Sequence, residues 1–552
     1  MSLQAPIIYC QQEETARMAH AAFPKGNAYL RLYDALGPIY TNPQFAALFP
    51  KDGQPAVAPA QLALVTIFQF AEGLSDRQAA DAVRDRISWK YALCLPLEDA
   101  GFDASVLSEF RARLVAGKAE YQLLDLLLAC CKAEGLVKAR GKARTDSTHV
   151  LAATRALNRL ETVGETMRHA LNTLASVAPA WLQPRIDPTW LERYGPRVDE
   201  YRFPKGTEAR QTLAAQIGAD GVRLYQAAIA ADAPVWLREV PAVETLRAVW
   251  LQQFYAPDEA GRVRWRGQED APPSALLINS PYDVEARYSK KRSTVWTGYK
   301  VHVTETCDAE TPNLITHVAT TPATVPDVEL LTPIHTALAN KGLLPGEHVV
   351  DAGYVDAEGI VTSHTEHRVD VVGPVPQDTR WQARAGEGFD LACFVLDWEQ
   401  EQATCPQGAT STKWSETHDR HDNPIINIRF SAVACRECPV RAQCTSSPTG
   451  PREITVRPKA QYLAQQQARR YQKTAEFHER YNARAGIEAT ISQGLRVADL
   501  RHARYIGLAK TRLQHVLTAA ALNLCRLSDW FAERPRASIR ITPFVKLATL
   551  AP

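Results

Sequence analysis

The sequence lacks any apolar run long enough to cross a membrane. Its longest apolar stretches, such as LLDLLLACC, are far shorter than the roughly 20 residues that a transmembrane helix needs. The first twenty residues, MSLQAPIIYCQQEETARMAH, also lack the basic segment and apolar run of a secretion signal. These absences predict a cytoplasmic protein that does not associate with a membrane.

Several common catalytic motifs are missing as well. GLVKARGKA has one residue too many between Gly135 and Gly141 for a phosphate-binding P-loop, and Ala143 stands where a Ser or Thr is required. The sequence contains neither the H-E-x-x-H motif of zinc proteases nor the nucleophile elbow of serine hydrolases. ATP-dependent chemistry and these hydrolase classes are therefore disfavoured.

The length and charge of the chain point to several units with different roles. A chain of 552 residues is too long for one ordinary core, and its 45% hydrophobic and 22% charged residues are typical of a globular protein. The net charge of +2 is unevenly distributed, because residues 452–552 carry 18 Lys and Arg against 7 Asp and Glu. Such a basic region suits a surface that binds phosphates, and a solvated helical face is the alternative interpretation.

The first part of the chain has helical periodicity. Apolar residues recur at helical spacing between Pro59 and Leu114, Gly73 is expected to end one helix, and Ser75 with Gln78 forms a capping box for the next. The polar faces carry arginines, which allows a helix-turn-helix-like role in DNA binding or ordinary helix packing. These arginines are Arg77, Arg84, Arg86, Arg111 and Arg113.

The middle of the chain predicts strands that come from distant segments. Four segments are rich in Thr and Val or end an apolar run: ARTDSTHVL, TVWTGYKVHVTETC, LITHVATTPATV and GEHVVDAGYV. A helix, DVELLTPIHTALANKG, separates the last two, and this order favours an α/β fold with a central mixed sheet. Residues 151–255 return to helical periodicity, whereas 375–458 shift to Pro, Gly, Thr, Trp and Cys with short alternating pieces.

Three carboxylates occupy positions that suit metal-dependent chemistry. Asp146 lies in the first strand, Asp351 ends a later apolar strand, and Glu488 lies on a helix far downstream. Carboxylates on two strand ends and a helix can hold two Mg²⁺ ions that clamp the attacking and leaving oxygens in phosphoryl transfer. Taken singly, a strand-end Asp often caps a turn and an exposed helical Glu often forms a salt bridge.

These residues carry a family resemblance. TDST around Asp146, VVDAGY around Asp351, and the Y-x2-R-x3-E spacing of Tyr481, Arg484 and Glu488 resemble the DDE transposases of bacterial insertion sequences. The resemblance runs over nearly the whole chain, including GLSDRQAADAV, GYKVHVTET and ARYIGLAKTRLQHVLTAAALNL. It implies a ribonuclease-H-like core in which Asp146, Asp351 and Glu488 bind Mg²⁺, with Mn²⁺ as an alternative ion.

One position departs from that signature. The family usually has a Lys seven residues after the Glu, but this sequence has Leu495 there, followed by Arg496. A phosphate contact is therefore expected from Arg496 or from outside this helix. Helical spacing places Tyr481, Arg484 and Glu488 on one face, where Tyr481 and Arg484 could contact DNA; an i,i+4 ion pair between Arg484 and Glu488 is the alternative.

Basic residues near the strands are further candidates for DNA contacts. Those predicted to guide phosphates are Lys142, Arg144, Lys290, Lys291, Arg292 and Lys300, although each alone could be an ordinary surface charge. His149 lies close to Asp146, and a histidine buried in the strand is its simpler interpretation.

Four cysteines cluster in the irregular segment. Cys435 and Cys438 have the C-x2-C spacing of a metal knuckle, and Cys444 and Cys405 could complete a tetrahedral Zn²⁺ site, with His418 or His421 as substitute ligands. Reduced unliganded thiols and disulfides remain the alternatives. The other seven cysteines, including the adjacent Cys130 and Cys131, are expected to pack as small hydrophobic residues.

Together these observations predict the following organisation. An all-helical N-terminal DNA-binding domain (1–135) precedes the first part of the ribonuclease-H-like core (136–374, with a helical insertion at about 151–280). A cysteine-containing insertion with β character (375–458), a helical completion of the core (459–530) and a tail (531–552) follow.

The predicted function is that of a transposase. It binds the terminal inverted repeats of an insertion sequence and cleaves and transfers strands of double-stranded DNA, both at element ends and at the target. A nuclease of the same fold that does not insert DNA and a non-catalytic DNA-binding regulator retained by the host are the alternatives. Holding two DNA ends together predicts a homodimer or higher assembly, located with the nucleoid in the cytoplasm.

Overall fold

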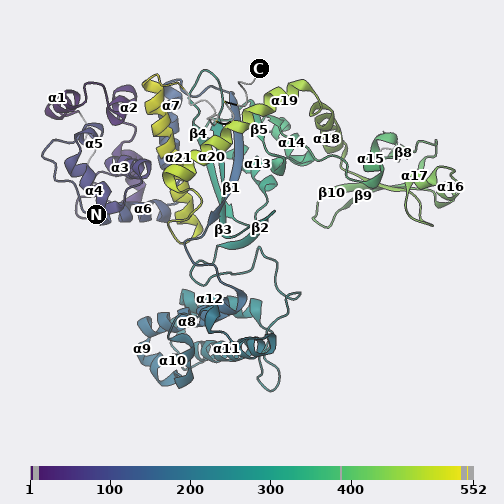
Figure 1. Cartoon of the computed structure of the whole chain (residues 1–552), viewed down its shortest axis with the longest axis horizontal. Helices are drawn as coiled ribbons and strands as arrows, with labels where there is room; N and C mark the ends of the chain where they lie inside the picture. The colour runs from purple at the N-terminus through teal and green to yellow at the C-terminus, as the bar shows by residue number, and fades with distance from the viewer. Residues whose placement is uncertain (1, 4–10, 386–387, 536–543, 545–546, 548–552) are drawn as a thin grey trace.

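The computed structural model describes residues 2–3, 11–385, 388–535, 544 and 547. A body built on a β-sheet carries helices on one side, a separate helical unit on another and an extended β-rich arm on a third (Figure 1). Most of the predicted tail lies outside the described residues. Within the described residues, no helix is long and apolar enough to cross a membrane.

The central sheet is mixed, as the sequence predicted. Its strands run in the order β2-β3-β1-β5-β6, and β4 also pairs with β3. β1 pairs antiparallel with β3 and parallel with β5, while β3 pairs antiparallel with β4 and β5 pairs parallel with β6. The strands are β1 (Lys142–Leu151), β2 (Arg287–Lys291), β3 (Thr294–Thr306), β4 (Ile315–Pro322), β5 (Glu347–Val350) and β6 (Asp370–Val372).

Two of these strands were not predicted, for physical reasons. β2 has the sequence RYSKK, so it lacks the apolar alternation of a half-buried strand. β6 has only three residues. The predicted helix between β4 and β5 is present as α13 (Leu331–Asn340), and α14 (Ala357–Thr365) connects β5 to β6.

The N-terminal helices match the sequence prediction in their local signals. Ser75 and Gln78 form the predicted capping box of α4, and Gly73 ends α3 in the left-handed conformation with φ 67°. The helices are α1 (Glu13–Ala22), α2 (Ala28–Leu36), α3 (Pro59–Glu72), α4 (Asp76–Asp85), α5 (Ile87–Ala92), α6 (Ser105–Ala116) and α7 (Gln122–Ala133).

These helices share one hydrophobic core with the sheet. The core joins residues of α2 to α7 with residues of β1, β3 and β4 and with the long, largely buried α21 (Leu508–Phe531). Figure 1 shows α21 between the N-terminal helices and the sheet. The front helices therefore form part of the body rather than a unit with a core of its own.

Most of the arginines proposed for DNA binding in this region take part in packing. Arg111 pairs with Asp76 at 2.6 Å and is buried, and Arg86 pairs with Glu72. Arg84 donates to the carbonyls of Ala100 and Phe102. These contacts favour the packing alternative for these three side chains.

The helical insertion has its own hydrophobic core and projects from the body (Figure 1). It follows β1 and precedes β2, as expected from the helical periodicity of that segment. Its longer helices are α8 (Arg159–Val177), α10 (Pro188–Tyr194), α11 (Thr207–Ile229) and α12 (Pro241–Gln253).

The arm between β6 and the last helices has the predicted β character. Its sheets are β11-β10-β9 and β7-β8, and its core is a separate small cluster. Its strands are β7 (Val395–Asp397), β8 (Gln402–Thr404), β9 (Ser411–His418), β10 (Pro424–Phe430) and β11 (Glu453–Val456), and its short helices include α16 (Ala432–Arg436) and α17 (Arg441–Cys444).

The chain then returns to the body through α18 (Lys459–Tyr471), α19 (Ala475–Tyr481), the 3₁₀ turn η8 (Asn482–Arg484) and α20 (Ala485–Ala498). The single helix expected through Tyr481, Arg484 and Glu488 is thus interrupted by a tighter turn, which changes the angular spacing of these residues. α20 lies against β1 and β3 and leads into α21.

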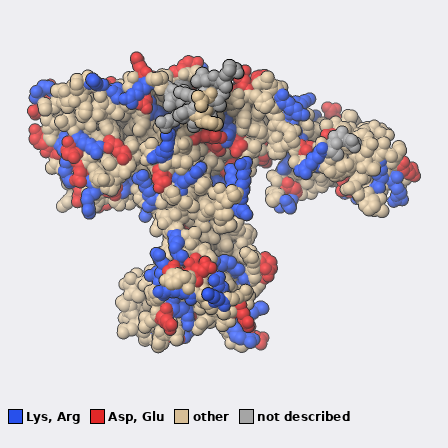
Figure 2. Space-filling view, in the orientation of Figure 1, with Lys and Arg blue, Asp and Glu red and all other residues tan. Residues whose placement is uncertain are grey.

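The predicted basic region does not form one continuous patch in the view of Figure 2, where Lys and Arg are interspersed with acidic side chains over the body. Several of its arginines are paired internally: Arg480 with Glu347, Arg512 with Glu120, and Arg526 with Glu305.

Candidate active site

The three predicted catalytic acids come from three elements that meet at one place on the sheet. Asp146 lies in β1, and Asp351 follows the last residue of β5, the parallel neighbour of β1. Glu488 lies in the first turn of α20, which packs against β1. Parallel pairing of β1 and β5 brings the two aspartates to the same region because Thr145 is registered with Val350.

All three carboxylates lie around the guanidinium of Arg484. Arg484 Nη2 is 2.7 Å from Asp146 Oδ2 and 4.0 Å from Asp351 Oδ2, and Nη1 is 2.9 Å from Glu488 Oε1. The i,i+4 ion pair considered as the alternative for Arg484 is therefore present, but it is one of three contacts. We call Asp146, Asp351, Glu488 and Arg484 the acid cluster.

The environment of Asp146 is unfavourable to its charge. Its side chain is 13% exposed, and burial raises the pKa of its carboxyl above the ordinary value. The positive charge of Arg484 and the N–H of Ser147, which donates to Asp146 Oδ1 at 2.8 Å, act in the opposite direction, and Asp351 adds to the rise. Glu488 has a side chain 64% exposed, so the cluster opens to solvent on the side of α20.

Tyr481 stacks on a protein ring in this structure. Its ring lies 5.4 Å from that of Phe477, with an interplanar angle of 11°. Burial raises the pKa of its hydroxyl, and Arg484 lowers it. The residue is half-buried beside the acid cluster.

Arg144, a predicted DNA contact, is buried and engaged elsewhere. It donates to Glu305 Oε1 at 2.7 Å and to the carbonyl of Ala483 at 2.7 Å, and only 8% of the residue is exposed. Its guanidinium connects β1 to β3 and to η8, so a phosphate contact by Arg144 would require it to leave these partners, and its role in guiding phosphates stays a prediction.

Glu305 is a neighbour of the site that sequence reasoning missed. Its carboxylate is fully buried and accepts hydrogen bonds from Arg144, Arg526 (2.7 Å) and the hydroxyl of Thr490 (2.6 Å). Thr490 lies two residues after Glu488 on α20, so this contact holds the helix against the sheet. We call Arg144, Glu305, Thr490 and Arg526 the anchor cluster. A charged residue within the otherwise Thr- and Val-rich strand GYKVHVTET was the available signal.

Lys300 is also engaged internally. Its ammonium donates to the carbonyl of Val325 at 2.6 Å and lies 3.0 Å from Asp327 Oδ1, with its side chain 14% exposed. A DNA contact by Lys300 would require it to leave these partners, and it stays a prediction. Asp327, which the sequence did not single out, also accepts from Ser147 at 3.2 Å and lies 3.6 Å from the exposed Lys291.

Other predicted residues occupy the surface. Arg496 is exposed on α20, whereas Leu495, at the position usually occupied by Lys, packs against the main core. Lys290, Lys291 and Arg292 are exposed where β2 turns into β3, and Lys291 exerts an electrostatic effect on Asp146. His149 is half-buried against Trp296, with ring centroids 5.5 Å apart, and burial lowers its pKa.

The carboxylates of the acid cluster are ligands that suit Mg²⁺, but in this structure they surround the guanidinium of Arg484. Three carboxylates supply the hard oxygen ligands that Mg²⁺ prefers. In the described part of the chain, no three His, Cys, Asp or Glu side chains are grouped closely enough to hold a metal ion. A positive charge does lie among the three acids, and it belongs to Arg484.

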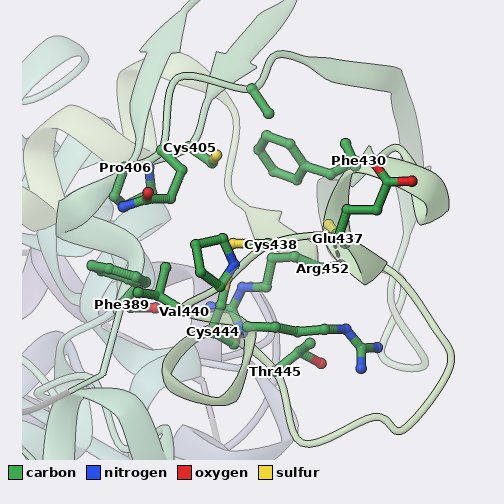
Figure 3. Close-up of a pocket in the computed structure, with 16 residues that line it drawn as sticks. Phe389, Cys405, Pro406, Phe430, Glu437, Cys438, Val440, Cys444, Thr445 and Arg452 are labelled. Atoms are coloured by element: carbon green, nitrogen blue, oxygen red, sulfur yellow. Dashed lines mark hydrogen bonds between the residues drawn. The ribbon is translucent and has the colours of Figure 1, made fainter.

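The four clustered cysteines line one cavity in the arm, together with Arg441 and Arg452 (Figure 3). His418 and His421 are exposed and do not line this cavity, which contradicts their suggested role as substitute ligands. Of the other cysteines, Cys94 and Cys131 are buried as predicted, but Cys393 is exposed, and Cys10 lies outside the described residues.

Two family models match the chain. The model described as "Transposase DDE domain" matches residues 404–528, which include the arm from Cys405 onward, Glu488 and most of α21. The model described as "Transposase domain (DUF772)" matches residues 17–113 in the N-terminal helices. Neither match spans half of the chain. No curated protein and no solved structure matches it. The two matches support an insertion-sequence transposase.

Proposed function

We propose that this chain is a DNA transposase that binds the terminal inverted repeats of an insertion sequence and catalyses metal-dependent cleavage and transfer of DNA strands. The observation that carries the proposal is the convergence of Asp146, Asp351 and Glu488 on one guanidinium. Arg484 and Asp146 are 338 residues apart in sequence, so only the fold explains their meeting.

The sheet topology supports a ribonuclease-H-like core for this proposal. β1, β3 and β4 form an antiparallel series, and β5 and β6 then add in parallel on the other side of β1 through α13 and α14. Asp146 lies on the central strand of this arrangement, and Asp351 lies at the carboxyl end of its parallel neighbour. The helical insertion and the arm enter at connections of the sheet, so they leave this core continuous.

The chemistry of the site follows from its charges. Asp146, Asp351 and Glu488 would hold two Mg²⁺ ions, or Mn²⁺, which when bound activate the attacking hydroxyl and stabilise the leaving oxygen. Arg484 would leave the acids and fork onto a DNA phosphate, an anion that its planar guanidinium fits well. The anchor cluster would keep α20 in place while Arg484 moves. The hydroxyl of Thr490 stays bonded to Glu305, and the carbonyl of Ala483 stays bonded to Arg144.

DNA contacts in this proposal come from exposed or half-buried side chains on the elements that form the site. Arg496, Tyr481 and Lys291 are the side chains from which we expect them, and the N-terminal helices would bind the element ends. Two ends must be held together for transfer, so the active form would be at least a dimer on double-stranded DNA. The protein would act on the nucleoid in the cytoplasm.

The test is a cleavage assay on DNA that carries the gene with its native flanks. Purified protein with Mg²⁺ is expected to cut at the inverted repeats that border the gene. Asp351→Asn removes one ligand charge and should lower the cleavage rate by at least about 10³-fold, or about 4 kcal/mol, while DNA binding persists. Glu358→Gln, an exposed acid on α14, is the matched control and should cleave normally.

Each other outcome has a definite meaning. Equal cleavage by wild type and Asp351→Asn would contradict the assignment of the catalytic acids. Cleavage without joining to a second DNA would identify a nuclease of the same fold. DNA binding without cleavage by the wild type would favour a non-catalytic regulator.

A further inference from the structure

The arm has little hydrophobic core to hold its segments together. The buried apolar residues of this unit are Phe394, Ala403, Ile426, Ile428, Phe430, Ile454 and Val456. Figure 1 shows the arm extending away from the body, so the main core does not support its far end. Small units with a core of this kind are often stabilised further by a disulfide or a bound metal.

Four thiols gather at the end of this small core. Cys405, Cys435, Cys438 and Cys444 line one cavity of about 270 Å³. Figure 3 shows Cys405, Cys438 and Cys444 around this cavity, on separate pieces of chain. Cys405 follows β8, Cys435 lies on α16, Cys438 follows that helix, and Cys444 ends α17. The cavity therefore brings together separate segments at the edge of the small core, against which Cys405, Cys435 and Cys444 also pack.

Backbone hydrogen bonds fix the surroundings of two of these thiols, and at Cys405 they form a tight turn. The N–H of Gly408 donates to the carbonyl of Cys405 at 2.8 Å, and the N–H of Cys405 donates to the carbonyl of Ala409 at 2.8 Å. At a second thiol, the N–H of Arg452 donates to Cys435 Sγ at 3.5 Å. Outer N–H groups of this kind orient the sulfurs of metal-binding cysteines.

The charges around the cavity also suit a thiolate site. Four thiolates around one Zn²⁺ carry a net charge of −2, which nearby cations stabilise. Arg441 and Arg452 line the cavity. Both are fixed by backbone carbonyls, Arg441 by those of Pro448 and Gly450 and Arg452 by that of Cys444. Their guanidinium groups thus hold positive charge beside the thiols without occupying the cavity.

We propose that Cys405, Cys435, Cys438 and Cys444 bind one structural Zn²⁺ ion that holds the arm together. All four are free thiols. Within the described residues they do not yet lie in the geometry of an occupied site, so the side chains turn into the cavity when the ion binds. The site is separate from the acid cluster, and its role is folding of the arm rather than reaction with DNA.

Metal analysis of the full-length protein tests this proposal. Protein purified under reducing conditions without chelator should contain one zinc ion per chain by mass spectrometry of the metal. Cys438→Ser should lose the ion, whereas Cys393→Ser, which changes an exposed thiol of the same arm, should keep it. Asp351→Asn should also keep it, which separates this test from the test of the catalytic acids.

A second measurement uses the wild type alone, in case Cys438→Ser does not fold. Replacement of zinc by Co²⁺ should produce the sulfur-to-cobalt charge-transfer bands and intense visible bands of a tetrahedral thiolate site. Removal of the metal should make four additional thiols reactive to a thiol reagent. Wild-type protein that binds neither Zn²⁺ nor Co²⁺, or that contains disulfides among these cysteines, would overturn the proposal.

Discussion

Two ionic clusters lie side by side on β1, and they differ in burial and in charge balance. Arg144 of the anchor cluster and Asp146 of the acid cluster are two residues apart, so they lie on the same face of the strand. Glu305 is fully buried and has three partners, whereas the side chain of Glu488 is 64% exposed. In the acid cluster, three carboxylates share one guanidinium.

This difference separates a structural cluster from the cluster that we propose to be catalytic. A buried carboxylate whose oxygens are all bonded, as in Glu305, is stable only because its partners remain in place. The acid cluster instead has more negative than positive charge and access to solvent, so an added cation would lower its energy. Helix α20 carries both Thr490 of the anchor cluster and Glu488 of the acid cluster. The contact of Thr490 with Glu305 therefore helps to position Glu488.

The largest expected effect on stability comes from Glu305→Gln. This substitution leaves the buried Arg144 and the partly buried Arg526 without a compensating charge, and breaking a buried pair costs about 3–5 kcal/mol. Thermal unfolding should show a melting temperature lower by several degrees. The same chemical change at Glu488 should cost less than about 0.5 kcal/mol, because the ion pair there is exposed.

Glu305→Gln and Glu488→Gln should therefore differ in whether they mainly reduce stability or cleavage activity. Glu488→Gln should retain stability and lose cleavage, whereas Glu305→Gln should lose stability first. Equal losses of stability in both variants would show that the two clusters do not differ in the way we describe.

Much of the fold followed from local patterns in the sequence. The capping box at Ser75 and the strand at Asp146 depend on neighbouring residues, so the sequence alone predicted them. The basic strand β2 was missed because its position depends on pairing with β3 rather than on its own composition. Charged edge strands carry little periodic signal.

The site was less predictable because its contacts join distant segments. Asp146, Asp351 and Glu488 were named from motifs, and the structure brings them together around Arg484. The partners of Arg144 and Lys300 could not be read from spacing, since Glu305 and Asp327 reach them only through strand pairing and a connecting turn. A basic residue near a predicted site can equally be bound within the protein, and only tertiary structure distinguishes the two cases.

A smaller effect is expected from Arg484→Ala. Without the guanidinium, three carboxylates repel one another, and the metal-free protein should lose about 1 kcal/mol of stability. Mg²⁺ should then raise the melting temperature more in this variant than in the wild type, because the ion no longer competes with Arg484. Arg496→Ala, on the exposed face of α20, is the control and should respond to Mg²⁺ as the wild type does. Equal stabilisation of all three proteins would contradict competition between Arg484 and the cation.

The smallest effect concerns the pH dependence of Asp146. Because burial raises the pKa of this carboxyl in the folded state, the folded protein holds the proton more tightly than the unfolded chain does. In metal-free buffer, the contribution of Asp146 to stability should therefore decrease as pH rises from the unfolded pKa, about 3.9, through the folded pKa, and then stay constant. The melting temperature of the wild type minus that of Asp146→Asn should decrease between about pH 4 and pH 7, because titrations shared by the two proteins cancel in this difference. If wild type and Asp146→Asn gave parallel curves, the carboxyl would titrate normally, and the acid cluster would be as well compensated as the anchor cluster.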